Sequence, residues 1–319
     1  MAAGAGLTAA AAARRRLSPE VLRQYRSLMT QTKTPTATDP STAATPSTAT
    51  EGRKVLTQEQ VNSFWQNGFL RFGKILDDEL LETMRREYDR EFELVSTGRS
   101  DRSMFRNLSG ASTDDLDTIN KSEKKMLQIM QMCERNIHFR KLVYNDAILD
   151  VIEDLMGPNI QLFHDQALYK PAHHGGPVHW HQDNAYWRCS PATLISCWLT
   201  LDDVDEHNGA MQLIPGTHTS LLDHAKAKQS DLLLDITEQI DASKAVVVDL
   251  PAGGVMFHHC QTFHYTAPNT TDRQRRAFAI HFMQPGTRSL RQQTYLAVSW
   301  GNPMLRMGLG NSGSTYFKK

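Results

Sequence analysis

The second half of the chain is a succession of short segments rich in β-branched and aromatic residues, and this pattern constrains the fold most. Turn signals such as Asn208-Gly209, Pro215-Gly216 and Pro251-Ala252-Gly253 separate the segments. Short strands between such turns are typical of a β-sandwich or a jelly roll. The predicted strands are residues 160–170, 194–201, 210–214, 245–250, 254–258 and 276–283.

Helical patterns precede these strands. Thr57 and Gln60 form the capping-box pair of a first helix, and Gly68 suits its C-terminal end. Asp77 is placed to cap a longer helix with apolar residues at helical spacing. Further helices are predicted over 123–133 and 137–156, and a polar loop over 98–117. Helices followed by strands indicate an α+β chain.

The first 52 residues are set apart by composition. Ala-rich sequence with several arginines precedes Thr/Ser/Pro/Ala-rich residues 31–50, and the first acidic residue is Glu20. The arginines follow the apolar run, which argues against a secretory signal and leaves a mitochondrial transit peptide or a disordered tail. We therefore predict a disordered segment over 1–52, one domain over 53–305 and a tail over 306–319. The expected location is cytoplasmic or mitochondrial.

Charge and cysteine usage narrow the class of partner. Lys+Arg and Asp+Glu are both 35, so the formal net charge is zero, which argues against a nucleic-acid-binding protein. The four cysteines form no CxxC pair, which argues against a disulfide framework, and no apolar stretch is long enough to span a bilayer. A small-molecule substrate is expected, with no nucleic acid and no membrane span, and the oligomeric state stays open.

The strongest chemical signal is the pair His181 and Asp183, two residues apart. Residues i and i+2 of a strand share a face, so an imidazole and a carboxylate would lie side by side. The pair is a weak signal alone, and a third ligand must come from His258, His259 or His264. A distant histidine is reasonable because a jelly roll brings early and late strands together. We favour His264 because Tyr265-Thr266-Ala267-Pro268-Asn269 follows it and Arg275 lies eleven residues on. Two histidines and one carboxylate are the ligand set of non-haem Fe(II) oxygenases, which leaves metal positions open.

Arg275 follows His264 by eleven residues. A guanidinium offers a fixed fork of donors that matches a carboxylate, and the Thr266 hydroxyl can add a bond to the same group. The pair could hold the distal carboxylate of 2-oxoglutarate. The alternative for Arg275 is a surface charge, because Arg273 and Arg276 flank it.

Three stretches together resemble the phytanoyl-CoA dioxygenase family of Fe(II)/2-oxoglutarate oxygenases. They are LYKPAHHGGPVHWHQDNAYW, SCWLTLDDVDEHNGAMQLIPGTHTS and HYTAPNTTDRQRRAFAIHF, and the resemblance covers about residues 56–285. It implies an α+β fold with a double-stranded β-helix core, of the jelly-roll or cupin-like kind, and N-terminal helices packed on it.

The resemblance also implies roles for single residues. His181, Asp183 and His264 would bind iron, and Arg275 and Thr266 would anchor 2-oxoglutarate. The implied cofactors are Fe(II), 2-oxoglutarate as cosubstrate and ascorbate, with O2 as the oxidant. Other residues are expected beside the cosubstrate (Gln166, Trp198, Tyr169) or on the substrate side (Gln182, Tyr186, Trp187).

The reaction expected from this resemblance is hydroxylation of an unactivated C–H bond in a small organic or lipid-like substrate, with release of succinate and CO2. Asp183 argues against a halogenase, in which chloride replaces the carboxylate, and no basic cluster demands a coenzyme A phosphate. Two alternatives stay open. One is a cupin-type metalloenzyme of another metal without 2-oxoglutarate chemistry, and the other is a jelly-roll binding module that keeps a structural metal.

Overall fold

The computed structural model describes residues 53–110, 115–228, 230–290 and 302–308, all within a unit that spans residues 41–319. The predictions for residues 1–52 lie outside the described residues. Among the helices that the structure describes, none combines the length and the apolar character needed to cross a bilayer.

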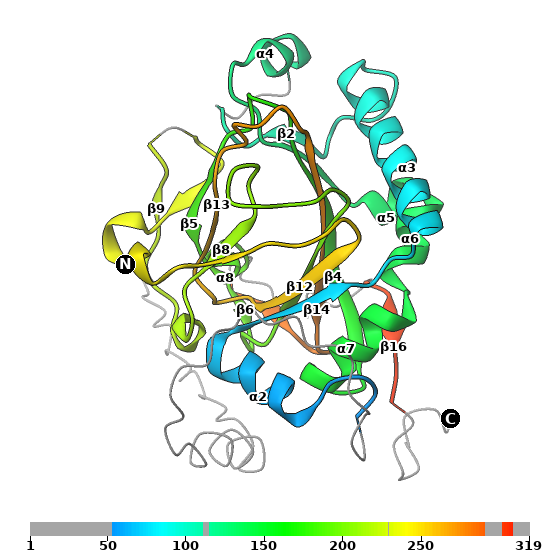
Figure 1. The fold of residues 1–319 in the computed structure, drawn as a ribbon, viewed down its shortest axis with the longest axis vertical. Helices are drawn as coiled ribbons and strands as arrows, with labels where there is room; N and C mark the ends of the chain where they lie inside the picture. The colour runs from blue at the N-terminus through cyan, green and yellow to red at the C-terminus, as the bar shows by residue number, and fades with distance from the viewer. Residues whose placement is uncertain (1–52, 111–114, 229, 291–301, 309–319) are drawn as a thin grey trace, which may run out of the picture. The chain divides into compact units, whose positions relative to one another are not determined.

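An antiparallel sheet of eight strands, here called the major sheet, forms one wall of the fold (Figure 1). The longest pairing joins Arg275–Met283 to Ile160–Lys170, with one register shift between His281 and Phe282. In sheet order the strands are β1 (Phe69–Lys74), β12 (Gly254–His259), β7 (Ile195–Thr200), β14 (Arg275–Met283), β4 (Ile160–Lys170), β3 (Leu127–Met130) and β2 (Phe105–Asn107), and β16 (Met304–Arg306) also pairs with β4.

A four-stranded antiparallel sheet, the minor sheet, lies across from the major sheet. The two sheets make the predicted double-stranded β-helix. The minor sheet has the order β11 (Val246–Val248), β8 (Met211–Leu213), β13 (His264–Thr266) and β5 (Val178–His181). Two short ribbons pair β9 (Ala225–Lys226) with β10 (Leu234–Asp235), and β6 (Cys189–Ser190) with β15 (Arg288–Ser289).

Helices cover the outer face of the major sheet and bury its apolar side chains. Phe139 packs on Phe278 of β14 with ring centroids 4.9 Å apart, and Tyr88 and Phe64 belong to the same core. In chain order, and whichever face they lie on, the helices of the described residues are α2 (Gln58–Asn67), α3 (Asp78–Ser96), α4 (Leu116–Lys121), α5 (Met132–Arg135), α6 (Ile137–Val143), α7 (Asp146–Met156) and α8 (Asp183–Trp187), with 3-10 turns η1 (Thr217–Thr219), η2 (Thr237–Gln239) and η3 (Ala242–Lys244).

Local capping signals are confirmed. The Thr57 side chain accepts from the Gln60 N–H, the Gln60 side chain accepts from the Thr57 N–H, and Gly68 ends α2 with φ 84°. Asp77 caps α3 through the N–H of Leu80. These bonds satisfy N–H groups that a helix leaves unpaired in its first turn, which is why such signals can be read locally.

Three local predictions are wrong. Residues 123–133 form strand β3 and short α5, because β3 pairs between β2 and β4 and that pairing outweighs helix propensity. The helix predicted over 137–156 is interrupted at Asn145, whose side chain caps α7. The loop predicted over 98–117 contains β2.

The domain limit predicted at residue 305 falls inside β16. Arg306, the last residue of that strand, makes ion pairs with Asp146 and Asp150 of α7. The folded part therefore continues past the predicted limit.

Candidate metal centre

The backbone brings together, at one end of the minor sheet, three side chains that could hold a metal ion. His181 is the last residue of β5, and it pairs directly with His264, the first residue of β13. Asp183 begins α8, one residue beyond Gln182. The pair His181 and Asp183 is therefore placed by the end of a strand and the start of a helix, and the prediction of one shared strand face is wrong.

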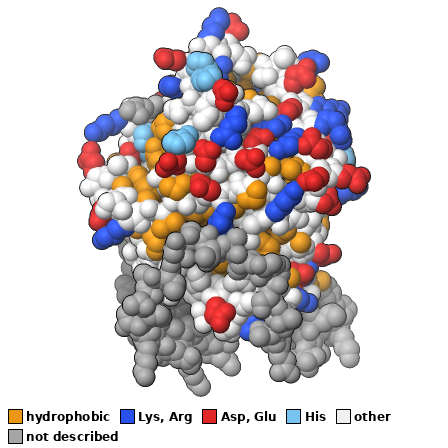
Figure 2. Space-filling model, viewed as in Figure 1, with side chains coloured by type: hydrophobic (Ala, Val, Ile, Leu, Met, Phe, Trp, Pro, Cys, Tyr) orange, Lys and Arg blue, Asp and Glu red, His pale blue; other side chains and the backbone are white. Residues whose placement is uncertain are grey.

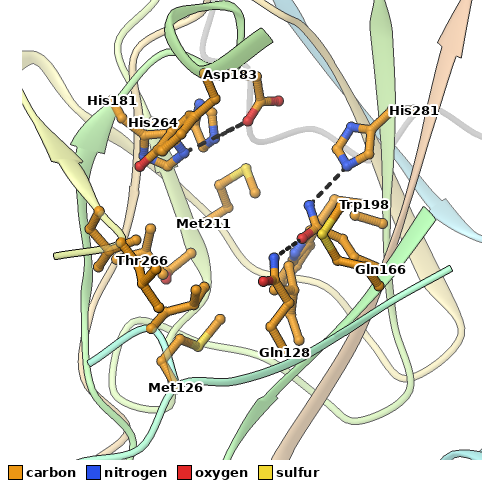
Figure 3. Close-up of a pocket in the computed structure, with 18 of the residues that line it drawn as sticks. Met126, Gln128, Gln166, His181, Asp183, Trp198, Met211, His264, Thr266 and His281 are labelled. Carbon is orange, nitrogen blue, oxygen red and sulfur yellow. Dashed lines mark hydrogen bonds and ion pairs between the residues drawn. The ribbon is translucent and has the colours of Figure 1, made fainter. Parts of the chain in front are cut away.

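The three side chains converge on one point (Figure 3). Asp183 Oδ1 lies 3.7 Å from His181 Nε2 and 3.5 Å from His264 Nε2. One ligand atom from each residue lies within 4.8 Å of the other two, and all three residues are buried. Among the described residues this is the only group of three or more His, Cys, Asp or Glu side chains with metal-binding geometry.

The imidazoles are held in the tautomer that a metal requires. His181 Nδ1 lies 2.7 Å from the carbonyl oxygen of His179, and His264 Nδ1 lies 2.9 Å from that of Thr262. A ring nitrogen facing a carbonyl must carry the proton, so each Nε2 presents a lone pair. Burial, followed by the neighbouring His264, lowers the pKa of His181, which favours the neutral ligating form.

The Asp183 carboxylate is oriented from behind. Its Oδ2 accepts a hydrogen bond from Ser196 Oγ at 3.2 Å and lies 3.1 Å from His258 Nε2. Burial alone would raise the pKa of this carboxyl, but the neighbouring imidazoles, His264 first and then His181 and His258, hold it well below its usual value. Asp183 is therefore an anion with Oδ1 directed at the histidines, and the donor set fits a divalent cation.

A cavity of about 430 Å³ extends from these three residues between the two sheets. Leu168, Met211 and Ala279 make part of its wall apolar, and Tyr186 and Trp187 of α8 line it as well. A water-poor pocket beside a metal strengthens every polar interaction inside it. The cavity has the size of a site for small molecules.

Arg275 is fully buried in the wall of this cavity. Its Nη1 donates to the carbonyl oxygen of Leu168 at 2.9 Å, and its guanidinium carbon lies 5.7 Å from the centroid of the Trp198 ring. Among the described residues no carboxylate lies within ion-pair distance of it, and its Nε has no hydrogen-bond partner. Burial lowers the pKa of Arg275 to about 10, which leaves it charged at neutral pH. The surface-charge alternative is therefore excluded.

Thr266 also lines the cavity, and its buried hydroxyl has no partner among the described residues. A buried cation without a counter-charge and a buried hydroxyl without a partner are costly to fold. A carboxylate that enters the cavity satisfies both, so this end of the pocket fits an anionic group.

A polar chain links the cavity wall to the ligand carboxylate. Gln166 accepts a hydrogen bond from Gln128, and its Nε2 lies 3.0 Å from His281 Nε2 (Figure 3). His281 Nδ1 lies 2.7 Å from Ser196 Oγ, which in turn donates to Asp183. Sequence reasoning included Gln166 and omitted Gln128, Ser196 and His281. The two-residue period that places 166 and 168 on the cavity face of β4, and 275, 279 and 281 on that of β14, is a signal for such residues.

The residues predicted around the pocket divide into two groups. Gln166, Trp198, Tyr186 and Trp187 line the cavity. Tyr169 does not, because adjacent residues of a strand face opposite sides: its ring packs 5.4 Å from that of Phe92, and its hydroxyl donates to Gln274 at 3.0 Å. The assignment of Tyr169 to the cosubstrate is therefore wrong.

Gln182 is also absent from the cavity wall. Its side chain donates to the carbonyl oxygens of Ser220 and Gln261, at 2.7 and 2.6 Å, and accepts from the N–H of Leu222. These bonds hold the segment between His181 and Asp183 in place. Gln182 therefore supports the centre from outside the pocket.

A family model matches most of the folded part of the chain. The model described as phytanoyl-CoA dioxygenase (PhyH) matches residues 64–277, which include all three residues of the centre and Arg275. The chain is 31% identical over 147 residues to a protein of Stutzerimonas stutzeri described as "Probable alpha-ketoglutarate-dependent hypophosphite dioxygenase". That alignment covers 44% of this chain and spans about half, 51%, of the relative.

A longer alignment joins the chain to the peroxisomal phytanoyl-CoA dioxygenase of Mus musculus, with 28% identity over 239 residues, 72% of this chain and 68% of the relative. Among solved structures, the non-haem alpha-ketoglutarate-dependent carbocyclase SnoK from nogalamycin biosynthesis is similar, with TM-score 0.58 and 20% identity. This match covers 73% of the chain and 85% of SnoK, and it supports the fold.

Proposed function

This chain belongs to the phytanoyl-CoA dioxygenase family of Fe(II)- and 2-oxoglutarate-dependent oxygenases, and from that premise we propose that it hydroxylates an unactivated C–H bond of a small organic or lipid-like substrate. O2 and 2-oxoglutarate are consumed, and succinate and CO2 are released. The observation that carries the proposal is the pairing of a three-residue metal centre with a buried arginine that lacks an anionic partner in the same cavity.

In this proposal His181, Asp183 and His264 hold Fe(II). Their donor atoms come from the ends of β5 and β13 and the start of α8, and three protein ligands leave coordination positions for other molecules. The bound metal supplies the activation of O2 that no side chain can provide. The protein fixes the Nδ1 of both imidazoles on backbone carbonyl oxygens and turns the Asp183 carboxylate toward their Nε2 atoms.

Arg275 and Thr266 bind the distal carboxylate of 2-oxoglutarate. The guanidinium fork matches two carboxylate oxygens, and the hydroxyl adds a further donor. Trp198 supports the guanidinium from its aromatic face, so the arginine keeps its orientation in a buried site. This anchor would hold the distal end of the cosubstrate in the cavity that His181, Asp183 and His264 also line.

The substrate side of the cavity is formed by Tyr186 and Trp187 of α8 together with Leu232 and Leu233. Aromatic and aliphatic walls beside the centre exclude water from the position where a C–H bond must lie. This composition supports an apolar or lipid-like group at that position. The predicted use of ascorbate and the predicted location stay predictions.

An anaerobic titration tests the proposal. Fe(II) and then 2-oxoglutarate are added to the metal-free protein, and visible absorption is recorded. We expect a weak charge-transfer band that needs both additions, and succinate formation once O2 is admitted. A protein that binds metal but gives neither band nor succinate would be a cupin-type metal protein without 2-oxoglutarate chemistry, and the proposal would fail.

A further inference from the structure

Lys170 is a fully buried lysine that the proposed reaction does not use. It is the last residue of β4 and the cross-strand partner of Arg275 on β14. Its Nζ donates to the carbonyl oxygen of Thr266 at 3.1 Å and also to that of Ala267. Lys170 therefore joins the two residues of the proposed carboxylate anchor: its backbone pairs with the strand of Arg275, and its side chain bonds to the carbonyl oxygen of Thr266.

This contact bridges the two sheets. Arg275 belongs to the major sheet, and Thr266 belongs to the minor sheet. The gap between the guanidinium and the hydroxyl thus depends on the spacing of the sheets at this end of the fold. Lys170, on the major sheet, holds the two sheets at this spacing because its Nζ donates to backbone carbonyl oxygens of the segment that carries Thr266.

The surroundings leave Lys170 little freedom to move. A Cβ added at Gly175 would lie 2.8 Å from Lys170 Cβ, and one added at Gly209, where φ is 97°, would lie 3.1 Å from Lys170 Cδ. The Asn269 side chain donates to the Lys170 carbonyl oxygen at 3.3 Å. The lysine is therefore packed on both sides and held at its backbone.

Its partners do not explain it as an ordinary stabilising ion pair. Among the described residues no carboxylate lies within ion-pair distance of Lys170, and burial, followed by the charge of Arg275, holds its pKa well below the usual value. Burying an amine without a counter-charge is unfavourable. We infer that the hydrogen bonds from Lys170 to the backbone of the Thr266 segment offset the cost of burying this amine.

We propose that Lys170 is a positioning residue that sets the distance between Arg275 and Thr266, and with it the affinity and chain-length selectivity for the distal carboxylate of a 2-oxo acid. The inference rests on the proposed function, because it takes Arg275 and Thr266 as the cosubstrate anchor. It assigns no contact between Lys170 and the cosubstrate.

Calorimetric binding to the Mn(II)-loaded protein tests this role without turnover. The probes are 2-oxoglutarate, 2-oxoadipate, which is one methylene longer, and 2-oxobutyrate, which lacks the distal carboxylate. In Lys170→Met we expect about tenfold weaker binding of 2-oxoglutarate and a smaller preference for it over 2-oxoadipate, because a displaced anchor loses alignment. Binding of 2-oxobutyrate should stay within about twofold of wild type, because it does not use the anchor.

Tyr88→Phe is the matched control. Tyr88 is buried, and its hydroxyl donates at 3.3 Å to the carbonyl oxygen of Ala277, two residues from Arg275 on the same strand. This bond joins α3 to the major sheet and does not reach the minor sheet. The control should leave the affinities for all three acids unchanged.

The outcomes separate the two proposals. A wild-type protein that binds 2-oxoglutarate no better than 2-oxobutyrate would overturn the anchor and the role of Lys170 with it. A wild-type preference that Lys170→Met fully retains, or an equal loss for all three acids, would overturn the role of Lys170 alone. If Lys170→Met does not fold, Lys170→Gln, which keeps an N–H donor on a shorter chain, is measured in the same way. An intermediate loss confined to the two dicarboxylic acids is then expected, and unchanged affinities would overturn the role.

Discussion

His264 lies directly across from His181 in the antiparallel pairing of β13 with β5, and the centroids of their imidazole rings are 4.1 Å apart. Main-chain pairing in a sheet therefore positions two of the three side chains of the centre. Sites built on strands hold their geometry better than sites built on loops alone. The strand pairing thus fixes the spacing of these two imidazoles.

Removal of one of these histidines should strongly weaken metal binding while the fold persists. In His264→Ala we expect the affinity for Co(II) to fall at least about 100-fold, because a ligand is lost outright. A Co(II) titration followed by visible absorption measures this. His207→Ala is the control, because the His207 side chain is exposed and lies outside the centre. Unchanged Co(II) affinity in His264→Ala would show that His264 is not a ligand.

Replacement of Arg275 should affect the cosubstrate and spare the metal. Arg275→Met should weaken 2-oxoglutarate binding by about 10- to 100-fold, the cost of losing charge-assisted hydrogen bonds of about 1.5–3 kcal/mol. Calorimetry on the Mn(II)-loaded protein gives the affinity, and Mn(II) content checks the metal site. Arg273→Met is the control, since Arg273 is about half exposed and pairs with Asp205. A parallel loss of Mn(II) would contradict a separate anchor.

The hydroxyl of Ser196 should tune the metal through Asp183. Ser196→Ala removes the 3.2 Å hydrogen bond to Asp183 Oδ2, and metal affinity should fall by about 10- to 100-fold, as for other groups that orient a ligand. Competition with a metal chelator measures the change. Thr200→Val removes another buried hydroxyl of β7, one that bonds to the carbonyl oxygen of Asp202 instead, and should leave the affinity alone. Equal effects in both variants would refute a specific role.

Acid should destabilise the fold partly through His259. Burial, followed by the neighbouring His218, lowers the pKa of His259 from 6.5 to about 3. Between these values the unfolded chain binds a proton that the folded chain excludes, so stability falls as pH decreases through this window. The slope from this one group is about 1.4 kcal/mol per pH unit at most.

His259→Asn should therefore flatten the pH dependence of the unfolding free energy below pH 6.5, because asparagine does not titrate and can still accept from the Gln261 N–H. Urea unfolding of the metal-free protein at several pH values measures the slope. A slope equal to that of the wild type would show that His259 binds a proton equally well in the folded and unfolded states.

Local sequence patterns predicted an element correctly where the hydrogen bonds that define its ends lie within that element. Thr57 and Gln60 cap α2, and Asp77 caps α3, through bonds within four residues. They failed where a distant partner decides, as at β3, which is a strand because β2 and β4 lie on either side of it. The same limit explains Tyr169, whose neighbours Phe92 and Gln274 come from other parts of the chain.

By itself the sequence determined the alternation of strands and turns that specifies a jelly roll, and the residue types His181, Asp183, His264 and Arg275 that specify a metal and an anion. Only the tertiary structure decided that Ser196 and His258 orient Asp183, and that Lys170 joins the two sheets beside Arg275. The physical reason is that these roles are distances between strands far apart in the chain. Such distances arise from sheet pairing and burial, which no local pattern encodes.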